Sequence, residues 1–137
     1  MKSGSYHLVG SPGCGSVLVE AALTLAGLPF ELEDIAFEAL GPQHPRLGQL
    51  NPLGQVPVLV LPDGQVMTES AAIVLYLGEV APTAGLVPPP GDARRPAFLR
   101  WLVTLVAAIY PTFTYADFPA RFVPAGKAAK QLEASSL

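Results

Sequence analysis

The chain has 137 residues, of which 50% are hydrophobic and 14% charged, with 15 prolines and 13 glycines. This length is sufficient for one domain, or for one domain and part of a second, and the apolar content excludes a disordered chain. The formal net charge is −3 and the eight Lys and Arg residues are scattered, which disfavours nucleic acids as partners. The single cysteine, Cys14, excludes a disulfide framework and a cysteine-rich metal site.

Two features predict a cytoplasmic protein that does not span a membrane. The longest apolar stretch, Trp101 to Tyr110, is well below the ~20 residues that a membrane span needs. The first five residues lead into a strand pattern rather than into the apolar core of a signal peptide.

The first 35 residues predict a strand, a helix and a second strand. Tyr6 to Val9 is a β-branched and aromatic run that ends at the breakers of residues 10–13. A helical pattern begins near Cys14 and ends at Gly27. Residues 30–35 alternate apolar and acidic side chains and predict a strand with a solvated acidic face. The apolar face of the predicted helix consists of Val17, Leu18, Ala21, Ala22 and Leu25.

Residues 36–80 predict a long loop, a hairpin and a helix. The breakers of residues 36–55 leave room for at most one helical turn, near Arg46 to Leu50, and loops this long are often functional. Two short strand patterns, at residues 57–61 and 66–68, flank a Pro-Asp-Gly-Gln turn. A helix then starts around Glu69 and Ser70. Its predicted apolar face consists of Ile73, Tyr76, Leu77 and Val80.

The composition and the hydrophobic pattern of the sequence change after residue 80. Residues 81–91 form a proline-rich connector, which is the natural place for a domain boundary. Asp92 is a candidate N-cap for a helix over residues 98–110 that is apolar on two sides. We expect Pro111 to kink or end this helix. A helix with two apolar faces and few neighbours predicts self-association.

Three motifs resemble glutathione transferases: the run Asn51–Pro57, the Asp63-Gly64 turn and the run Thr68–Ile73. The β-α-β-ββ-α order with a proline opening the third strand is the thioredoxin-like arrangement of that family. The resemblance runs from residue 6 to about 80, continues into the first helix of the family's all-α second domain and then stops, so we expect a truncated product or a fragment. The predicted fold is α/β: a thioredoxin-like domain at 1–81, a linker at 82–91 and a partial all-α domain at 92–137.

The resemblance implies a glutathione site. In the family the peptide bond before the proline that corresponds to Pro57 is cis. This bond turns the backbone of the preceding residue, here Val56, toward the cysteinyl part of glutathione, and Gln55 is expected to bind glutathione beside it. Ser70 would hold the γ-glutamyl carboxylate and Glu69 the ammonium group. The residues alone also allow a trans turn proline and simple helix capping at these positions.

A basic side chain is expected at the glycine carboxylate of glutathione. Related sequences carry it in the long loop, where Ala39 stands near one such position, and His44 or Arg46 would take its place. A solvated loop charge is the alternative for each of them. His7, on the first strand, has no acidic or metal-spaced partner in the sequence and is interpreted as structural.

Three residues compete to activate the glutathione thiol: Cys14, then Ser11, then Ser16. A helix N-terminus or a hydroxyl beside the sulfur stabilises a thiolate. Cysteine-bearing bacterial classes of the family place one residue between a Pro-Gly pair and the cysteine, whereas Cys14 follows Gly13 directly. Serine-bearing classes place a serine in this turn, and Cys14 is alternatively a small buried apolar residue.

The implied function is that of a detoxifying glutathione transferase. It would use glutathione as co-substrate, with no bound cofactor or metal, stabilise its thiolate for attack on a small electrophile, and form a homodimer. One alternative is a thiol transferase or reductase in which Cys14 forms a mixed disulfide with glutathione. Another is a noncatalytic glutathione-binding or protein-interaction module, like the transferase-like stringent starvation proteins that bind RNA polymerase.

Overall fold

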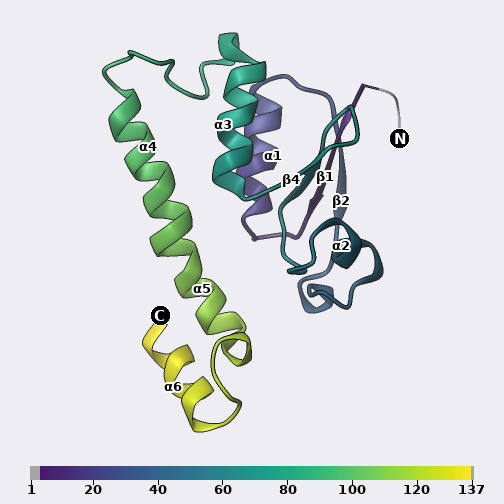
Figure 1. Ribbon diagram of the computed structural model, residues 1–137, viewed down its shortest axis with the longest axis vertical. Coiled ribbons are helices and arrows are strands. Elements are labelled where there is room, and N and C mark those ends of the chain that lie inside the picture. The colour runs from purple at the N-terminus through teal and green to yellow at the C-terminus, as the bar shows by residue number, and fades with distance from the viewer. Residues whose placement is uncertain (1–3, 137) are drawn as a thin grey trace. The chain divides into compact units, whose positions relative to one another are not determined.

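A computed structural model describes residues 4–136 and divides into two compact units, the first ending at Arg95 and the second beginning at Pro96. The first unit contains a four-stranded sheet in the order β2-β1-β3-β4 (Figure 1). β1 pairs parallel with β2, whereas the β1–β3 and β3–β4 pairs are antiparallel. The strands are β1 Tyr6–Gly10, β2 Phe30–Asp34, β3 Val58–Val60 and β4 Val66–Thr68.

Three helices accompany this sheet: α1 Ser16–Leu25, α2 Pro45–Leu50 and α3 Ser70–Val80. α1 and α3 lie side by side (Figure 1), which completes the predicted β-α-β-ββ-α order and confirms the thioredoxin-like fold class. Successive strand residues point to opposite faces, so the sheet buries apolar side chains on both sides. Leu8 and Leu59 are fully buried on one face, and Val9 and Val58 on the other.

The predicted apolar face of α1 was correct for Ala22 and wrong for Val17, Ala21 and Leu25. Val17 and Leu25 are 49% and 72% exposed, and the buried residues are Ser16, Val19, Ala22 and Leu23. The run Val17-Leu18-Val19 offers two apolar faces, so periodicity alone does not choose between them. The buried face begins at Ser16, which packs against Gly10 and hydrogen-bonds to Ser11.

The predicted face of α3 was correct for Ile73 and Leu77, which are fully buried. Val80, the last residue of the helix, is 43% exposed, and Val74 is buried in its place. The hairpin and the start of this helix at Ser70 are confirmed.

The long segment between β2 and β3 is packed rather than loose. It contains the 3₁₀ turn Phe37–Ala39 and the six-residue helix α2. The predicted position near Arg46 to Leu50 was correct, but the limit of one helical turn in this segment was too low. A Cβ on Gly54 would lie 2.0 Å from the Gly41 carbonyl carbon, and one on Gly48 would lie 2.3 Å from the Pro42 oxygen. The backbone at residues 41 and 42 therefore fits only against glycine at these two positions.

In the connector, a 3₁₀ turn spans Pro82–Ala84 and Val87 packs against Gly78 of α3. A Cβ on Gly78 would lie 2.4 Å from a Val87 methyl group. The predicted boundaries at residues 81, 91 and 92 stay predictions.

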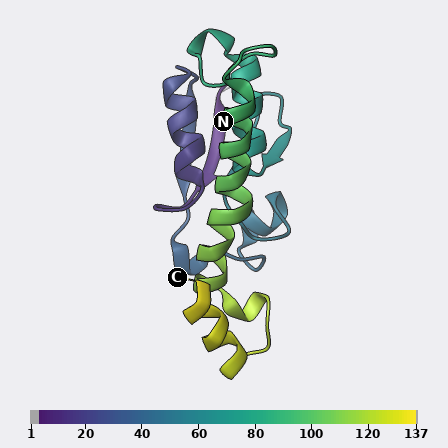
Figure 2. The same cartoon turned by 90° about the vertical axis from the view of Figure 1, so that its left-hand side faces the viewer.

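The second unit begins with one continuous run of helix. It comprises α4 Arg95–Thr104, a π-helical segment Leu105–Ile109 and α5 Tyr110–Asp117 (Figure 2). Pro111 does not end this helix, so that part of the expectation was wrong. The helix departs from regular α geometry in the π-helical segment just before Pro111, and its widened backbone accommodates the proline ring, which would otherwise clash with the carbonyl four residues earlier. A 3₁₀ turn, Pro119–Arg121, and α6 Lys127–Ser136 follow.

The helix Arg95–Asp117 is 23 residues long with a mean hydropathy of 1.4, enough in length and composition to cross a membrane. This is weak evidence for a span, because a core helix of a soluble protein passes the same test. The predicted helix over residues 98–110 was too short at both ends, mainly because Pro111 was expected to kink or end it. The absence of a membrane span stays a prediction.

Candidate functional site

One row of the sheet brings three segments of the chain to a common edge. Val9 of β1 pairs with Val58 of β3, and Val58 pairs with Thr68 of β4. β1 and β4 run toward this edge and β3 runs away from it. The residues after β1, before β3 and after β4 therefore meet here, where α1 and α3 also begin (Figure 1).

The turn between β1 and α1 holds the three candidates for thiol activation. The Ser16 hydroxyl donates to the Ser11 carbonyl at 3.0 Å and accepts from the Ser11 N–H at 3.1 Å. A Cβ on Gly10 would lie 2.8 Å from the Ser16 Cβ and Oγ, so the close approach needs glycine. Ser16 thus closes the turn with its side chain.

Cys14 and Ser11 differ in what their side chains do. Cys14 is half-buried two residues before α1, and its backbone N–H donates to the Ser11 carbonyl at 3.1 Å. Ser11 is 1% exposed, and its Oγ has no hydrogen-bond partner within residues 4–136. A buried hydroxyl without a partner is rare and costly, which marks Ser11 for a ligand or water contact.

The segment before β3 contains the cis Val56–Pro57 peptide bond that the resemblance implied. Asn51, 6% exposed, organises this segment: its Nδ2 donates to the Gln55 carbonyl at 2.9 Å and its Oδ1 accepts from the Leu53 N–H at 3.1 Å. From the sequence, Asn51 was identified only as part of the Asn51–Pro57 run, and these hydrogen bonds were not predicted. Asn before a Pro-x-Gly run is the signal that pointed to it.

At the start of α3, Glu69 has φ 67° and ψ 103°, a left-handed conformation that non-glycine residues rarely adopt. Such a conformation costs about 1–3 kcal/mol and clusters at functional sites. Glu69 occupies the N-cap position, yet its side chain makes no capping hydrogen bond. Capping therefore does not account for this carboxylate. Ser70, the first helical residue, is 6% exposed.

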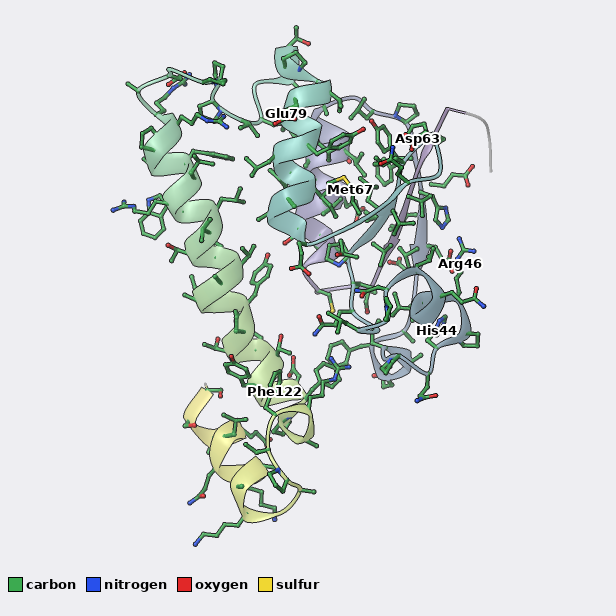
Figure 3. All side chains as sticks on the ribbon, in the orientation of Figure 1. His44, Arg46, Asp63, Met67, Glu79 and Phe122 are labelled. Atoms are coloured by element: carbon green, nitrogen blue, oxygen red, sulfur yellow. The ribbon has the colours of Figure 1, made fainter. Side chains whose placement is uncertain are left out.

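His44 and Arg46 both come from the start of α2 (Figure 3). His44 is the N-cap, and its Nδ1 accepts from the Leu47 N–H at 3.1 Å. A neutral imidazole that accepts at Nδ1 carries its proton on Nε2, which is then a donor. The Arg46 Nε donates to Glu33 Oε2 at 2.7 Å.

The expectation that His7 has no acidic partner was wrong. Its Nε2 lies 2.8 Å from Glu33 Oε2, and its Nδ1 lies 3.9 Å from Glu31 Oε2. The parallel register, which the sequence does not display, places Glu31 beside His7 and Glu33 beside Val9 on the same face of the sheet. Among residues 4–136, no group of three or more His, Cys, Asp or Glu side chains is arranged to hold a metal ion.

The strand order, the cis proline and the shared edge define a thioredoxin-like domain. The sequence model of the family described as "Glutathione S-transferase, N-terminal domain" matches residues 17–80. The chain is 47% identical, over 84% of its length, to the uncharacterized GST-like protein YncG of Escherichia coli K12. The chain belongs to the glutathione transferase family.

Solved structures with similar folds include complexes with glutathione. A glutathione transferase homolog from Sulfitobacter with bound glutathione matches 97% of this chain and 64% of its own, at 28% identity and a TM-score of 0.87. A sphingomonad glutathione S-transferase complexed with glutathione matches 95% and 63%, at 31% identity and a TM-score of 0.73. The chain spans only about half the length of the curated relatives that it matches, for example 56% of YncG and 48% of a Xanthomonas campestris relative.

Proposed function

We propose that this chain binds glutathione at the edge formed by the row Val9, Val58 and Thr68, and that it stabilises the glutathione thiolate for attack on a small electrophile. The observation that carries the proposal is the row itself, because it gathers the three segments that the resemblance assigned to glutathione. In the reaction the sulfur gives its electron pair to an electrophilic carbon. A C–S bond forms, the leaving group departs with its electron pair, and the thiol proton goes to solvent.

Each part of glutathione has a partner of fitting chemistry at this edge. The γ-glutamyl carboxylate meets the Ser70 hydroxyl and the free N–H groups at the start of α3, where the helix dipole favours an anion. The Glu69 carboxylate meets the ammonium group. The Val56 backbone pairs with the cysteinyl backbone as an added strand would. The Nε2–H of His44 donates to the glycine carboxylate. Gln55 lines the same segment.

The thiolate lies by the β1–α1 turn in this proposal, with Cys14 first, Ser11 second and Ser16 third as the group facing it. The Ser16 hydroxyl proton already bonds to the Ser11 carbonyl, which supports placing Ser16 last. The partnerless Ser11 hydroxyl is available to donate to a thiolate. Loss of conjugation in Ser11→Ala with full conjugation in Cys14→Ala would reverse the first two.

The proposal is tested by titration calorimetry with glutathione and by turnover with a chromogenic electrophile. Ser70→Ala removes a charge-assisted hydrogen bond, which contributes ~1.5–3 kcal/mol, so the Kd should rise at least tenfold. Ser135→Ala, which removes an exposed hydroxyl of α6, is the matched control and should leave the Kd unchanged. No binding by the unmodified chain, or equal Kd values for both variants, would refute the proposal.

A thiol transferase is the second candidate, favoured by the partly accessible Cys14 beside the start of α1. There the Cys14 thiolate attacks the disulfide of a glutathione mixed disulfide, forms a new S–S bond and expels the other thiolate; a second glutathione then releases the product as glutathione disulfide. Iodoacetamide labelling near pH 7, with exchange activity lost in Cys14→Ala, would favour this candidate. We also propose a cytoplasmic homodimer with a role in detoxification.

A further inference from the structure

The short helix α2 carries two of the segments assigned to glutathione, one at each end. His44 is its N-cap, and Asn51, just past its last residue, holds the turn that leads to Val56. The inference below rests on the proposed function, because it concerns how these two segments are held. A helix of six residues is not stable on its own, so α2 depends on its contacts with the sheet.

The first of these contacts is apolar. Leu47, fully buried, joins Val9, Ile35 and Val58 in a core cluster, and Val56 packs against that cluster. Leu50, the last residue of α2, also packs against this cluster, so two apolar side chains hold the second half of the helix on the sheet. Neither of them holds the first turn, which carries His44.

The second contact is polar and joins α2 to two strands. The Arg46 Nε donates to Glu33 Oε2 of β2 at 2.7 Å, and the same oxygen lies 2.8 Å from the His7 Nε2 of β1. The Arg46 Nη2 lies 3.2 Å from that His7 nitrogen. One carboxylate oxygen thus receives a guanidinium and an imidazole from two different elements. The third charged group facing His7 is Glu31, whose carboxylate lies 3.9 Å from Nδ1.

We infer that Arg46, Glu33 and His7 form a positioning cluster that sets the orientation of α2 and thereby holds His44 and Val56 where they bind the glycyl and cysteinyl parts of glutathione. None of the three contacts the ligand in this arrangement. The cluster lies toward the start of the first strand, since His7 pairs with Glu31 and Val60 rather than with the row at the edge. Arg46 is therefore a second anchor of α2 rather than a ligand for the glycine carboxylate.

The test compares Glu33→Gln with Glu31→Gln in the full chain. Both changes remove one carboxylate from the same face of the same strand, and only the first breaks the pair with Arg46. Because the pair is partly exposed, the Kd for glutathione should rise about three- to fivefold in Glu33→Gln and in Arg46→Gln. It should stay unchanged in Glu31→Gln. The double variant Glu33→Gln/Arg46→Gln should have a Kd no higher than that of either single variant, because each change removes the same ion pair.

Two further readouts separate positioning from general destabilisation. γ-Glutamylcysteine lacks the glycine that His44 would meet, so the variants should weaken its binding less than that of glutathione. Amide hydrogen exchange of residues 47–56 in the ligand-free protein should accelerate in Glu33→Gln and Arg46→Gln, and α1 should be unaffected. Equal effects of Glu33→Gln and Glu31→Gln, or unchanged exchange in residues 47–56, would overturn the inference. An unmodified chain that binds no glutathione refutes the proposed function instead, and the exchange measurement still decides whether the cluster anchors α2.

Discussion

The two units of this chain are both rich in apolar side chains but bury them to different degrees. In the first unit, apolar residues from strands and helices far apart in the sequence close over both faces of one sheet. Among residues 96–136, only Leu102 is buried, whereas Trp101 and Phe113 are 57% and 53% exposed. A sheet recruits distant segments to its two faces, while a long helix with one short partner covers little of its own surface. Apolar composition alone therefore does not produce a core.

The difference between the two units is tested most directly by the same glycine-to-alanine change in each of them. Gly54→Ala combines a positive φ of 64° with a Cβ 2.0 Å from the Gly41 backbone, whereas Gly126 has a positive φ of 111° and open space around it. We expect Gly54→Ala to lower the free energy of unfolding by about 3 kcal/mol or more, and Gly126→Ala by about 1–2 kcal/mol. Differential scanning calorimetry measures both. Equal losses of unfolding free energy would mean that the backbone of residues 41 and 42 moves aside at little cost.

The exposed helix of the second unit leads to the next prediction. We expect a dimer or larger species in sedimentation velocity, because exposed apolar side chains gain ~1.5–3 kcal/mol each on burial. Phe113→Glu should raise the dissociation constant of that species at least tenfold. Leu25→Glu is the control in the first unit, since Leu25 is 72% exposed. A compact monomer at micromolar concentration would contradict the expectation.

The smallest effect concerns Asp92 and Arg94, which lie near the end of the first unit. Hydrogen bonds from the Arg94 side chain, and then from its backbone, lower the pKa of Asp92 to about 2. A carboxyl with a lowered pKa adds stability above its unfolded pKa, and this contribution fades as the pH falls from about 4 to 2. When the melting temperature is measured at a series of pH values, Asp92→Asn should therefore reduce its decrease between about pH 4 and 2. The reduction should be slight, because the group is exposed.

Asp63→Asn is the comparison for the hairpin turn of the first unit, where hydrogen bonds from Gln65 lower the pKa of Asp63. This variant should weaken the dependence of stability on pH over the same acid range. If Asp92→Asn leaves that dependence unchanged and Asp63→Asn weakens it, the hydrogen bonds between Arg94 and Asp92 do not contribute to folding.

The parts of the fold that depend on local chemistry could be predicted from the sequence. The Asp63-Gly64 turn specified the hairpin, and the resemblance of the run around Val56 and Pro57 implied the cis bond. The parts that depend on distant partners could not. The buried face of α1 includes the contact between Ser16 and Gly10, and the partners of His7 follow from the β1–β2 register.

The candidate site divides in the same way. The sequence motifs predicted Val56, Glu69 and Ser70 as binding residues, and these roles stay predictions. The left-handed backbone of Glu69 and the hydrogen bonds of Asn51 emerged only from three-dimensional contacts. Pro111 is a case in which a strong local rule, that proline ends a helix, did not hold, because the helix widens just before it.

The row that links Val9, Val58 and Thr68 also limits which insertions the chain can tolerate. Adding one residue to the turn between Leu61 and Gln65 would shift β4 along β3 by a step unless the extra residue bulged out. Such a shift reverses which face each β4 side chain occupies and moves the start of α3 away from Val56. Variation in length should therefore be excluded from the hairpin turn and tolerated in exposed turns such as residues 123–126, where no sheet register is at stake.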